Sequence, residues 1–354
     1  MIGERIKQAR VAAGLSLRAL ADRAGVTAMA ISKYETGKST PSSGVLLALA
    51  KALSVRTEYF FRPVKVELQE VEYRKHSRLP ARALQQIEGD VIEQIERFLE
   101  LEQLLPNGPV QTFKLPGKLP AAVSTLNQVE DVAAALREAW SLGVDPIPVL
   151  TDMLEERGVK VFQSQAIPGD FDGLAAKVNG IPVIVVSGKA PGDRQRFTMA
   201  HELGHLVLGG RLAAGIDDEA ASNRFAGAFL APASEVGKEL GEHRAWLEPQ
   251  ELAALKKAYG LSMGAWMHRA NDLGIMSDAR YLEMVKYFRA RGWHKTEPGE
   301  PYPQERPQLF EQLVYRALGQ DLISESKAAE LLRLPLSEFQ NKRNMQGAQA
   351  AAHQ

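Results

Sequence analysis

The sequence predicts a multidomain fold with an all-α head, an α+β middle domain and a helical C-terminal region. Short amphipathic stretches broken by glycine fill the N-terminal part, helical and strand-like patterns then alternate, and helical spacing of apolar residues returns near the C-terminus. A chain of 354 residues with 45% hydrophobic content can build two or three cores. We expect the parts to span residues 1–62, 63–125, 126–295 and 296–354.

The head is expected to be a bundle of short helices. Residues 16–25 and 28–34 read as two helices joined by a tight turn, and Thr27 is a residue type that caps helix N-termini. Residues 31–38 (ISKYETGK) resemble the Xre/Cro-like helix-turn-helix family, whose pattern covers residues 1–62. The resemblance implies that the helix beginning at Thr27 enters the major groove of a double-stranded DNA operator.

The resemblance also implies a set of DNA-binding residues. They are Arg18, Thr27, Ala28, Met29, Ser32, Lys33, Lys38, Ser39 and Thr40. Family members often carry Gln where this chain has Leu17 and Ala28, so base reading is expected to depend more on Thr27, Met29, Ser32 and DNA shape. Domains of this type commonly need two copies to read a palindrome, which predicts a homodimer.

Charge is distributed as DNA binding requires. Residues 1–62 hold ten Lys/Arg and four Asp/Glu, a balance of +6. The whole chain has 43 of each kind, so the remainder has 33 basic and 39 acidic residues, or −6. A basic head on an acidic body favours an electrostatic DNA footprint, although a small solvated helical domain could also carry this charge.

A long amphipathic helix is predicted between residues 78 and 105. Its apolar residues recur at helical spacing, so the stripe could form a dimer seam or pack on the body, and we favour the dimer seam. The stretch from Pro106 to Pro120 reads as an exposed connector.

The middle domain alternates helices and strands. Helices are expected at 129–142 and 147–157, a strand at 159–162, and a hairpin formed by 174–178 and 181–186 around Asn179-Gly180. The hairpin could bind an extended peptide by backbone pairing, but a role as sheet core is the stronger expectation. Residues 194–209 form a further helix, and two or three more are expected between 309 and 339, before a disordered tail.

The segment His201-Glu202-Leu203-Gly204-His205 carries the chemistry. On a helix, His201 and His205 project from one face and can share a tetrahedral Zn²⁺. Glu202 follows the first histidine, as expected of a base that takes a proton from metal-bound water. The chain has no cysteine, so the third protein ligand must be His, Asp or Glu.

A second helix with an acidic start is predicted from Asp217 to Pro232. A carboxylate in its first turn could point back at the two histidines, although acidic residues there often only complement the helix dipole. Glu219 is the preferred third ligand and Asp218 is the alternative.

These segments together resemble the ImmA/IrrE family of zinc metallopeptidases. The resemblance rests on residues 196–205, on Glu219 with the segment 223–226 (NRFA), and on 230–232 (LAP), and it covers roughly residues 130–295. It implies a zincin-like metallopeptidase domain of α+β fold in which Glu219 is the third ligand. Some members are known or suspected to cut transcriptional repressors.

Other residues are weaker candidates for the site. His243, His268 and Tyr259 could stabilise an oxyanion or a leaving group, but each is more simply explained as a structural or surface residue. Arg194 and Arg196 are expected to anchor the start of the helix predicted at 194–209, which we call the metal helix, or to pair with acids, rather than to act on substrate.

Two functions remain open from the sequence. In the first, a DNA-bound regulator carries an active zinc endopeptidase that cuts a regulatory protein, itself or a partner, to switch gene expression under stress. In the second, the metal domain is a non-cutting sensor or partner-binding module, or the chain belongs to a toxin–antitoxin pair. No membrane-spanning run and no signal peptide are evident, so a cytoplasmic protein is expected.

Overall fold

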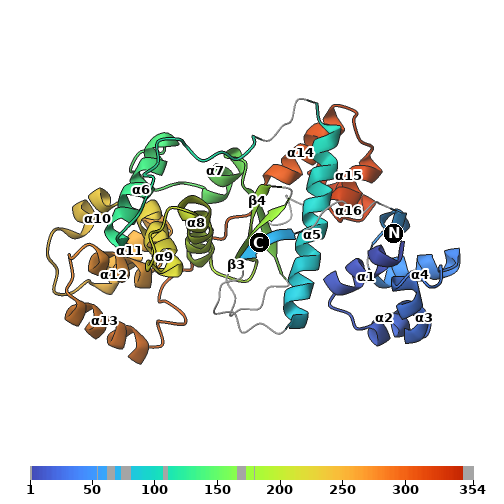
Figure 1. Cartoon of the computed structure of the whole chain (residues 1–354), viewed down its shortest axis with the longest axis horizontal. Coiled ribbons are helices and arrows are strands. Elements are labelled where there is room, and N and C mark those ends of the chain that lie inside the picture. The colour runs from blue at the N-terminus through green and yellow to red at the C-terminus, as the bar shows by residue number, and fades with distance from the viewer. Residues whose placement is uncertain are drawn as a thin grey trace.

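The computed structural model describes residues 2–53, 55–61, 68–72, 81–106, 111–165, 173–178 and 180–345. It confirms the predicted fold class, with a helical head, an α+β body and C-terminal helices (Figure 1). Within these residues, no helix combines the length and the apolar character needed to cross a membrane.

The head is a bundle with its own core. Its elements are α1 (Ile2–Ala12), α2 (Leu17–Ala24), α3 (Ala28–Glu35), α4 (Ser43–Leu53) and the 3-10 turn η1 (Thr57–Phe61). Leu20 and Ile31 are fully buried between the helices. Ser16 caps α2 and Thr27 caps α3, each hydroxyl accepting a backbone N–H 3.1 Å away, which confirms Thr27 as an N-cap.

The long helix α5 (Ala81–Leu104) corrects one expectation. Its apolar stripe, from Ile87 through Phe98 to Leu105, is at most 5% exposed because it packs against one face of the sheet and the C-terminal helices. The stripe is therefore used inside the chain and is not available as a dimer seam. Periodicity alone could not separate these outcomes, because both need the same spacing.

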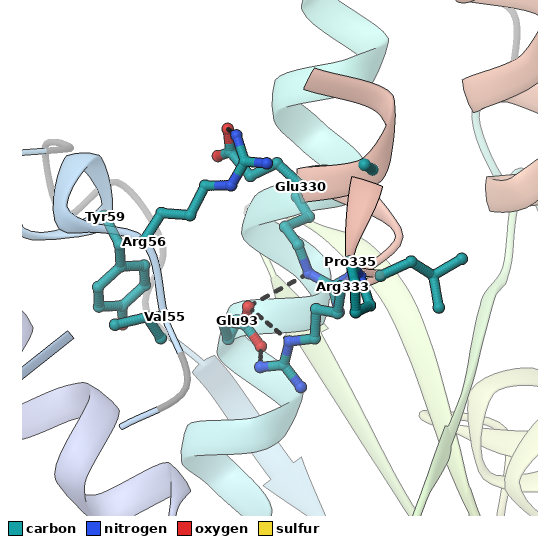
Figure 2. A pocket seen from close by; sticks show the side chains of 10 residues that line it. Val55, Arg56, Tyr59, Glu93, Glu330, Arg333 and Pro335 are labelled. Atoms are coloured by element: carbon teal, nitrogen blue, oxygen red, sulfur yellow. Dashed lines mark hydrogen bonds and ion pairs between the residues drawn. The ribbon is translucent and has the colours of Figure 1, made fainter. Parts of the chain in front are cut away.

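The other face of α5 receives the head. The buried Arg5 of α1 pairs with Glu96 of α5 and lies over the ring of Tyr59 at 5.2 Å from its centroid. A pocket of about 300 Å³ opens beside this contact, where η1 and the two residues before it meet α5 and the C-terminal helices (Figure 2). In it Arg333 pairs with Glu93, and Arg56 of the head lies 3.8 Å from Glu330.

A four-stranded mixed sheet forms the centre of the body. The strands β1 (Leu68–Glu72), β2 (Lys160–Ser164), β3 (Gly173–Val178) and β4 (Ile181–Ser187) are ordered β1-β3-β4-β2. The predicted hairpin is confirmed as β3 and β4, while β1 was not expected. Because β1 pairs with β3 and β2 pairs with β4, both hairpin strands are internal, which makes the role as sheet core correct and removes the hairpin as a peptide-binding edge.

Helices cover both faces of the sheet. Val183 and Val185 point toward α5, and Ile184 and Val186 point into the core that contains α8 (Gly192–Leu208), since side chains alternate along a strand. This second layer and the helices beyond it are α6 (Leu126–Ala139), α7 (Leu150–Glu156), α9 (Asp218–Leu230), α10 (Ala233–Leu240), α11 (Pro249–Tyr259), α12 (Met263–Asp272) and α13 (Asp278–Ala290) (Figure 1).

The C-terminal region is fastened to the body. Its helices are α14 (Leu309–Gly319), α15 (Glu325–Leu331) and α16 (Leu336–Arg343); most of the predicted tail lies outside the described residues. The segment before α14 crosses the start of α8. There Gly192 donates its N–H to the carbonyl of Tyr302 at 3.0 Å, and a Cβ on Gly192 would lie 1.9 Å from the carbonyl oxygen of Pro303.

The connector before α6 is less exposed than expected. Residues 107–110 lie outside the described residues, but Phe113 and Leu115 pack against the main core and Leu119 is 8% exposed. Further on, Val123 donates its N–H to the carbonyl of Arg211 at 2.9 Å. The apolar side chains within the Pro/Gly-rich stretch explain why it lies on the body.

Replacing Glu155 by Gln should make the protein more stable than the wild type at the upper end of the pH range, near pH 8. Burial raises the pKa of this carboxyl from 4.5 to about 8. Between these pH values Glu155 is ionised in the unfolded chain but still protonated in the folded protein. The free energy of unfolding is therefore highest, as far as this group is concerned, below pH 4.5, and it falls as the pH rises to about 8. We expect Glu155→Gln to remove this fall, worth on the order of a few kcal/mol.

Urea unfolding near pH 4.5 and near pH 8 measures the difference. The exposed neighbour Glu156, changed to Gln, is the matched control and should keep the wild-type pH dependence. Parallel stability curves for wild type and Glu155→Gln across this range would contradict the prediction.

Candidate metal centre

The candidate metal centre lies on the seam between α8 and α9. His205 of α8 lies beside Asp218, Glu219 and Ser222 of α9, while His201, one turn earlier, contacts Asn223. Residue numbers fall along α8 as they rise along α9, so the two helices run antiparallel. Successive turns of one helix thus face successive turns of the other.

Three side chains offer ligand atoms to a single point. Among the described residues, His201, His205 and Glu219 form one potential metal-binding group, with ligand atoms within 4.8 Å of one another. The two Nε2 atoms are 3.0 Å apart, and they lie 3.5 and 3.8 Å from the carboxylate oxygens of Glu219. Bonds of about 2.0–2.1 Å to a tetrahedral Zn²⁺ separate the ligands by roughly 3.3 Å, so this donor set fits zinc.

The opposite ring nitrogens have partners of their own. His201 Nδ1 is 2.9 Å from Asn223 Oδ1, and His205 Nδ1 is 2.8 Å from Asp218 Oδ2 and 3.1 Å from Ser222 Oγ. When each Nδ1 donates a proton to these acceptors, each Nε2 keeps its lone pair for a metal. Asp218, the alternative third ligand, therefore contacts the outer nitrogen of His205, while the carboxylate of Glu219 faces the two Nε2 atoms.

The remaining residue of the motif is Glu202, which is 1% exposed on α8. It lies outside the three-residue ligand group, next in sequence to the buried His201. A carboxylate in a dry site adjoining a metal ligand can take a proton from a bound water and pass it on, which is the chemistry of a general base.

The structure exposes most of the predicted DNA-binding residues of the head. Arg18, Thr27, Lys33 and the run Lys38–Thr40 are exposed, and Ala28 and Ser32 are partly buried. Met29 is an apolar side chain on α3 that is nevertheless 70% exposed. A bare methionine on this helix suits contact with the apolar edge of a base.

The three weaker candidates, Tyr259, His243 and His268, lie in different parts of the body. Tyr259 is buried; its hydroxyl lies 3.2 Å from Glu239 Oε1, and burial followed by that carboxylate raises the pKa of Tyr259 to about 12. His243 is an exposed residue in a different pocket. His268 shares a cavity with Asn223, beside the metal centre.

Arg196 anchors the start of the metal helix, as predicted. Its fully buried guanidinium pairs with Glu305 and donates to the carbonyls of Ile147 and Tyr259 at 2.7 and 3.3 Å.

Sequence reasoning missed the roles of Ser222 and Asn223. The available signal was their spacing, since they lie three and four residues after Glu219 and so share its helical face. It also missed that Asp218 contacts the outer nitrogen of His205. An acidic residue at this position is equally expected if it complements the helix dipole, binds the metal or orients a histidine, so the sequence could not separate these roles.

Two family models match segments of this chain. Residues 6–60 match the helix-turn-helix family model, and residues 154–271 match the model of the IrrE N-terminal-like domain. The chain thus joins an Xre-like helix-turn-helix domain to a domain of the ImmA/IrrE-like metallopeptidase family.

Curated relatives match over shorter segments. A 60-residue segment is 43% identical to an uncharacterized transcriptional regulator in the ATPase CF(0) region of Rhodospirillum rubrum, and covers 17% of this chain and 56% of that protein. A 70-residue segment is 34% identical to the uncharacterized HTH-type transcriptional regulator y4aM of Sinorhizobium fredii, and covers 20% of this chain and 49% of the relative. The chain spans about half the length of these relatives.

Zinc content tests the ligand set. We expect about one zinc per chain in the wild type, a similar content in Glu202→Gln, and none in the double variant His201→Ala/His205→Ala. Asp218→Ala should keep the three ligands but lose orientation of His205, lowering metal affinity about 10–100-fold. Elemental analysis after dialysis, and competition with a chelator, measure these differences.

The exposed His243, changed to Ala, is the matched control and should retain zinc like the wild type. Equal zinc in the wild type and in the double histidine variant would place the metal elsewhere.

Proposed function

We propose that this protein is a DNA-binding transcriptional regulator that carries a zinc-dependent endopeptidase, which cleaves a regulatory protein to switch gene expression. The observation that carries the proposal is the complete set around His201 and His205. Both rings have an outer partner, both inner nitrogens face Glu219, and the buried Glu202 adjoins them. This set lies in one chain with a helix-turn-helix head.

In the proposed reaction, the chain's own residues position and move protons. A bound Zn²⁺ would lower the pKa of a water molecule and polarise the scissile carbonyl. Glu202 accepts the proton from that water and delivers it to the leaving amine. Asn223 and Asp218 hold the two imidazoles in the tautomer that keeps Nε2 unprotonated. The apolar surroundings of α8 keep bulk water from Glu202.

In the proposed DNA complex, α3 lies in the major groove of a double-stranded operator. Lys33 and Lys38 are exposed and suit phosphate contacts, whereas Thr27, Met29 and Ser32 suit contacts to base edges. Binding as a homodimer would let two heads read a palindromic site. The seam of such a dimer must lie elsewhere than the apolar stripe of α5, which is buried within the chain.

The substrate is either a partner protein or this chain itself. The head and the metal helix lie on opposite sides of α5 and the sheet (Figure 1). Self-cleavage would most simply occur in the connector between the head and the metallopeptidase-like domain. Residues between Phe113 and Val123 pack on the body, so this segment would first have to be released locally. A partner with an exposed extended segment needs no such step.

A non-cutting sensor is the second candidate. The observation that favours it is the pocket between the head and the body, where Arg56 and Tyr59 of the head face Glu93, Glu330 and Arg333 (Figure 2). A change in this junction could move the head without any peptide bond being cut.

DNA binding should be strong, salt-dependent and confined to the head. Lys33→Ala and Lys38→Ala should weaken binding to all sequences alike and each lower the salt dependence of log affinity by about one unit. Changes at Thr27 or Ser32 should alter sequence preference instead. Gel-shift titrations at several salt concentrations measure both effects.

Lys257, an exposed lysine of α11, provides the control because its change to Ala removes the same charge far from the head. Full affinity in a fragment of residues 63–354 would show that the head is not the DNA-binding element.

Glu202→Gln separates the peptidase from the sensor. If cleavage drives switching, a reporter in cells that carry this variant should stay in its unstressed state under DNA damage or other stress, while the wild type switches. Immunoblots should show fragments of the chain or of a partner only with the wild type. Identical switching without fragments in both strains would favour the sensor.

A further inference from the structure

A cavity of about 310 Å³ adjoins the candidate metal centre, and of its lining residues only Asn223 has a role in the chemistry described above. It lies between α8, α9 and α12. Its lining comprises Phe197, Asn223, Gly227, Gly264, Ala265, His268, Arg269 and Asp272.

The cavity lies next to the candidate metal centre, further along the seam between α8 and α9. Phe197 precedes His201 by four residues on α8, and Gly227 follows Asn223 by four on α9. The cavity thus lies about one helical turn, roughly 5.4 Å, from the turn that carries His201. Alternate side chains of an extended peptide are separated by about 6.6 Å, so a peptide at the metal could place a nearby side chain here.

The polar groups of the cavity offer hydrogen-bond donors. Arg269 is 1% exposed, and its Nε–H has no partner among the described residues, although its two terminal nitrogens bind Glu130 and a backbone carbonyl. Asn223 uses its Oδ1 toward His201, which leaves its amide N–H groups. His268 uses Nδ1 toward Asp272, which leaves Nε2.

The acidic groups, by contrast, are already paired. Asp272 lies 3.2 Å from His268 Nδ1 and 2.9 Å from a terminal nitrogen of Arg224. Glu130 pairs with both Arg224 and Arg269. The two carboxylates balance the two guanidinium groups, and the hydrogen bond with Asp272 raises the pKa of His268, which favours a further positive charge at the rim.

We propose that this cavity is a specificity subsite that receives an acidic side chain, Glu or Asp, of a peptide substrate near the scissile bond. The proposal rests on the proposed peptidase function. The carboxylate would accept hydrogen bonds from Asn223 Nδ2 and His268 Nε2 near the buried guanidinium of Arg269, while Phe197 and Ala265 contact the aliphatic part of the side chain.

Two substitutions alter the cavity without touching the metal ligands. Ala265→Phe fills it, because Ala265 is a small, partly buried lining residue. His268→Glu reverses the charge at its rim. Their matched controls are Ala279→Phe and His243→Glu, which make the same changes at exposed positions outside the cavity.

The probe is an equimolar library of short synthetic peptides. Zinc-loaded wild type and each variant are incubated with it, and mass spectrometry identifies the residues on either side of each cut. In parallel, zinc-loaded Glu202→Gln, alone and combined with each substitution, is used to retain peptides by affinity, which reports binding without cleavage.

We expect acidic residues to be enriched about threefold to tenfold at one position near the cut. Ala265→Phe should abolish this enrichment and His268→Glu should replace it with Lys or Arg, while both controls leave it unchanged. A preference that lacks acidic residues, or that neither substitution changes, would overturn the subsite. Retention of acidic peptides without any cutting by the wild type would leave the subsite standing and refute the peptidase.

Discussion

The close contact between α8 and α9 is the constraint on which the candidate metal centre depends. Gly204 lies between the two histidines, and a Cβ there would lie 3.1 Å from the Phe225 ring and 3.2 Å from the Ser222 Cα. The absence of a side chain lets the helices approach closely enough for Glu219 to reach both Nε2 atoms. The same approach brings Asp218, Ser222 and Asn223 to the outer nitrogens, so the three candidate ligands and the partners of the two histidines share one packing interface.

The C-terminal region contributes to this arrangement from a distance in sequence. Glu305 pairs with the buried Arg196 and also accepts hydrogen bonds from the backbone and hydroxyl of Thr151, which ties α7 to the start of α8. The fully buried guanidinium needs such partners, since an unpaired buried charge is costly. The segment before α14 therefore fixes the start of α8 against the body.

The head has a separate core but is docked through charged contacts. Arg5 is the centre of that docking, with Glu96 on one side and Tyr59 on the other. One face of α5 contacts the head, and the other packs against the sheet and the C-terminal helices. This helix therefore connects the DNA-binding head to the body that carries the candidate metal centre.

The sequence by itself determined the features that depend on local spacing: the head's helices, the hairpin, and the pairing of His201 with His205 four residues apart. It narrowed the third ligand to an acidic first turn, because a helix start is locally encoded. Only the tertiary structure decided that Glu219 faces inward while Asp218 orients His205, that β1 closes the sheet edge, and that the stripe of α5 is internal. These outcomes depend on how elements far apart in sequence pack. The period of a helix or strand determines which residues share a face, but it does not determine which other element that face contacts.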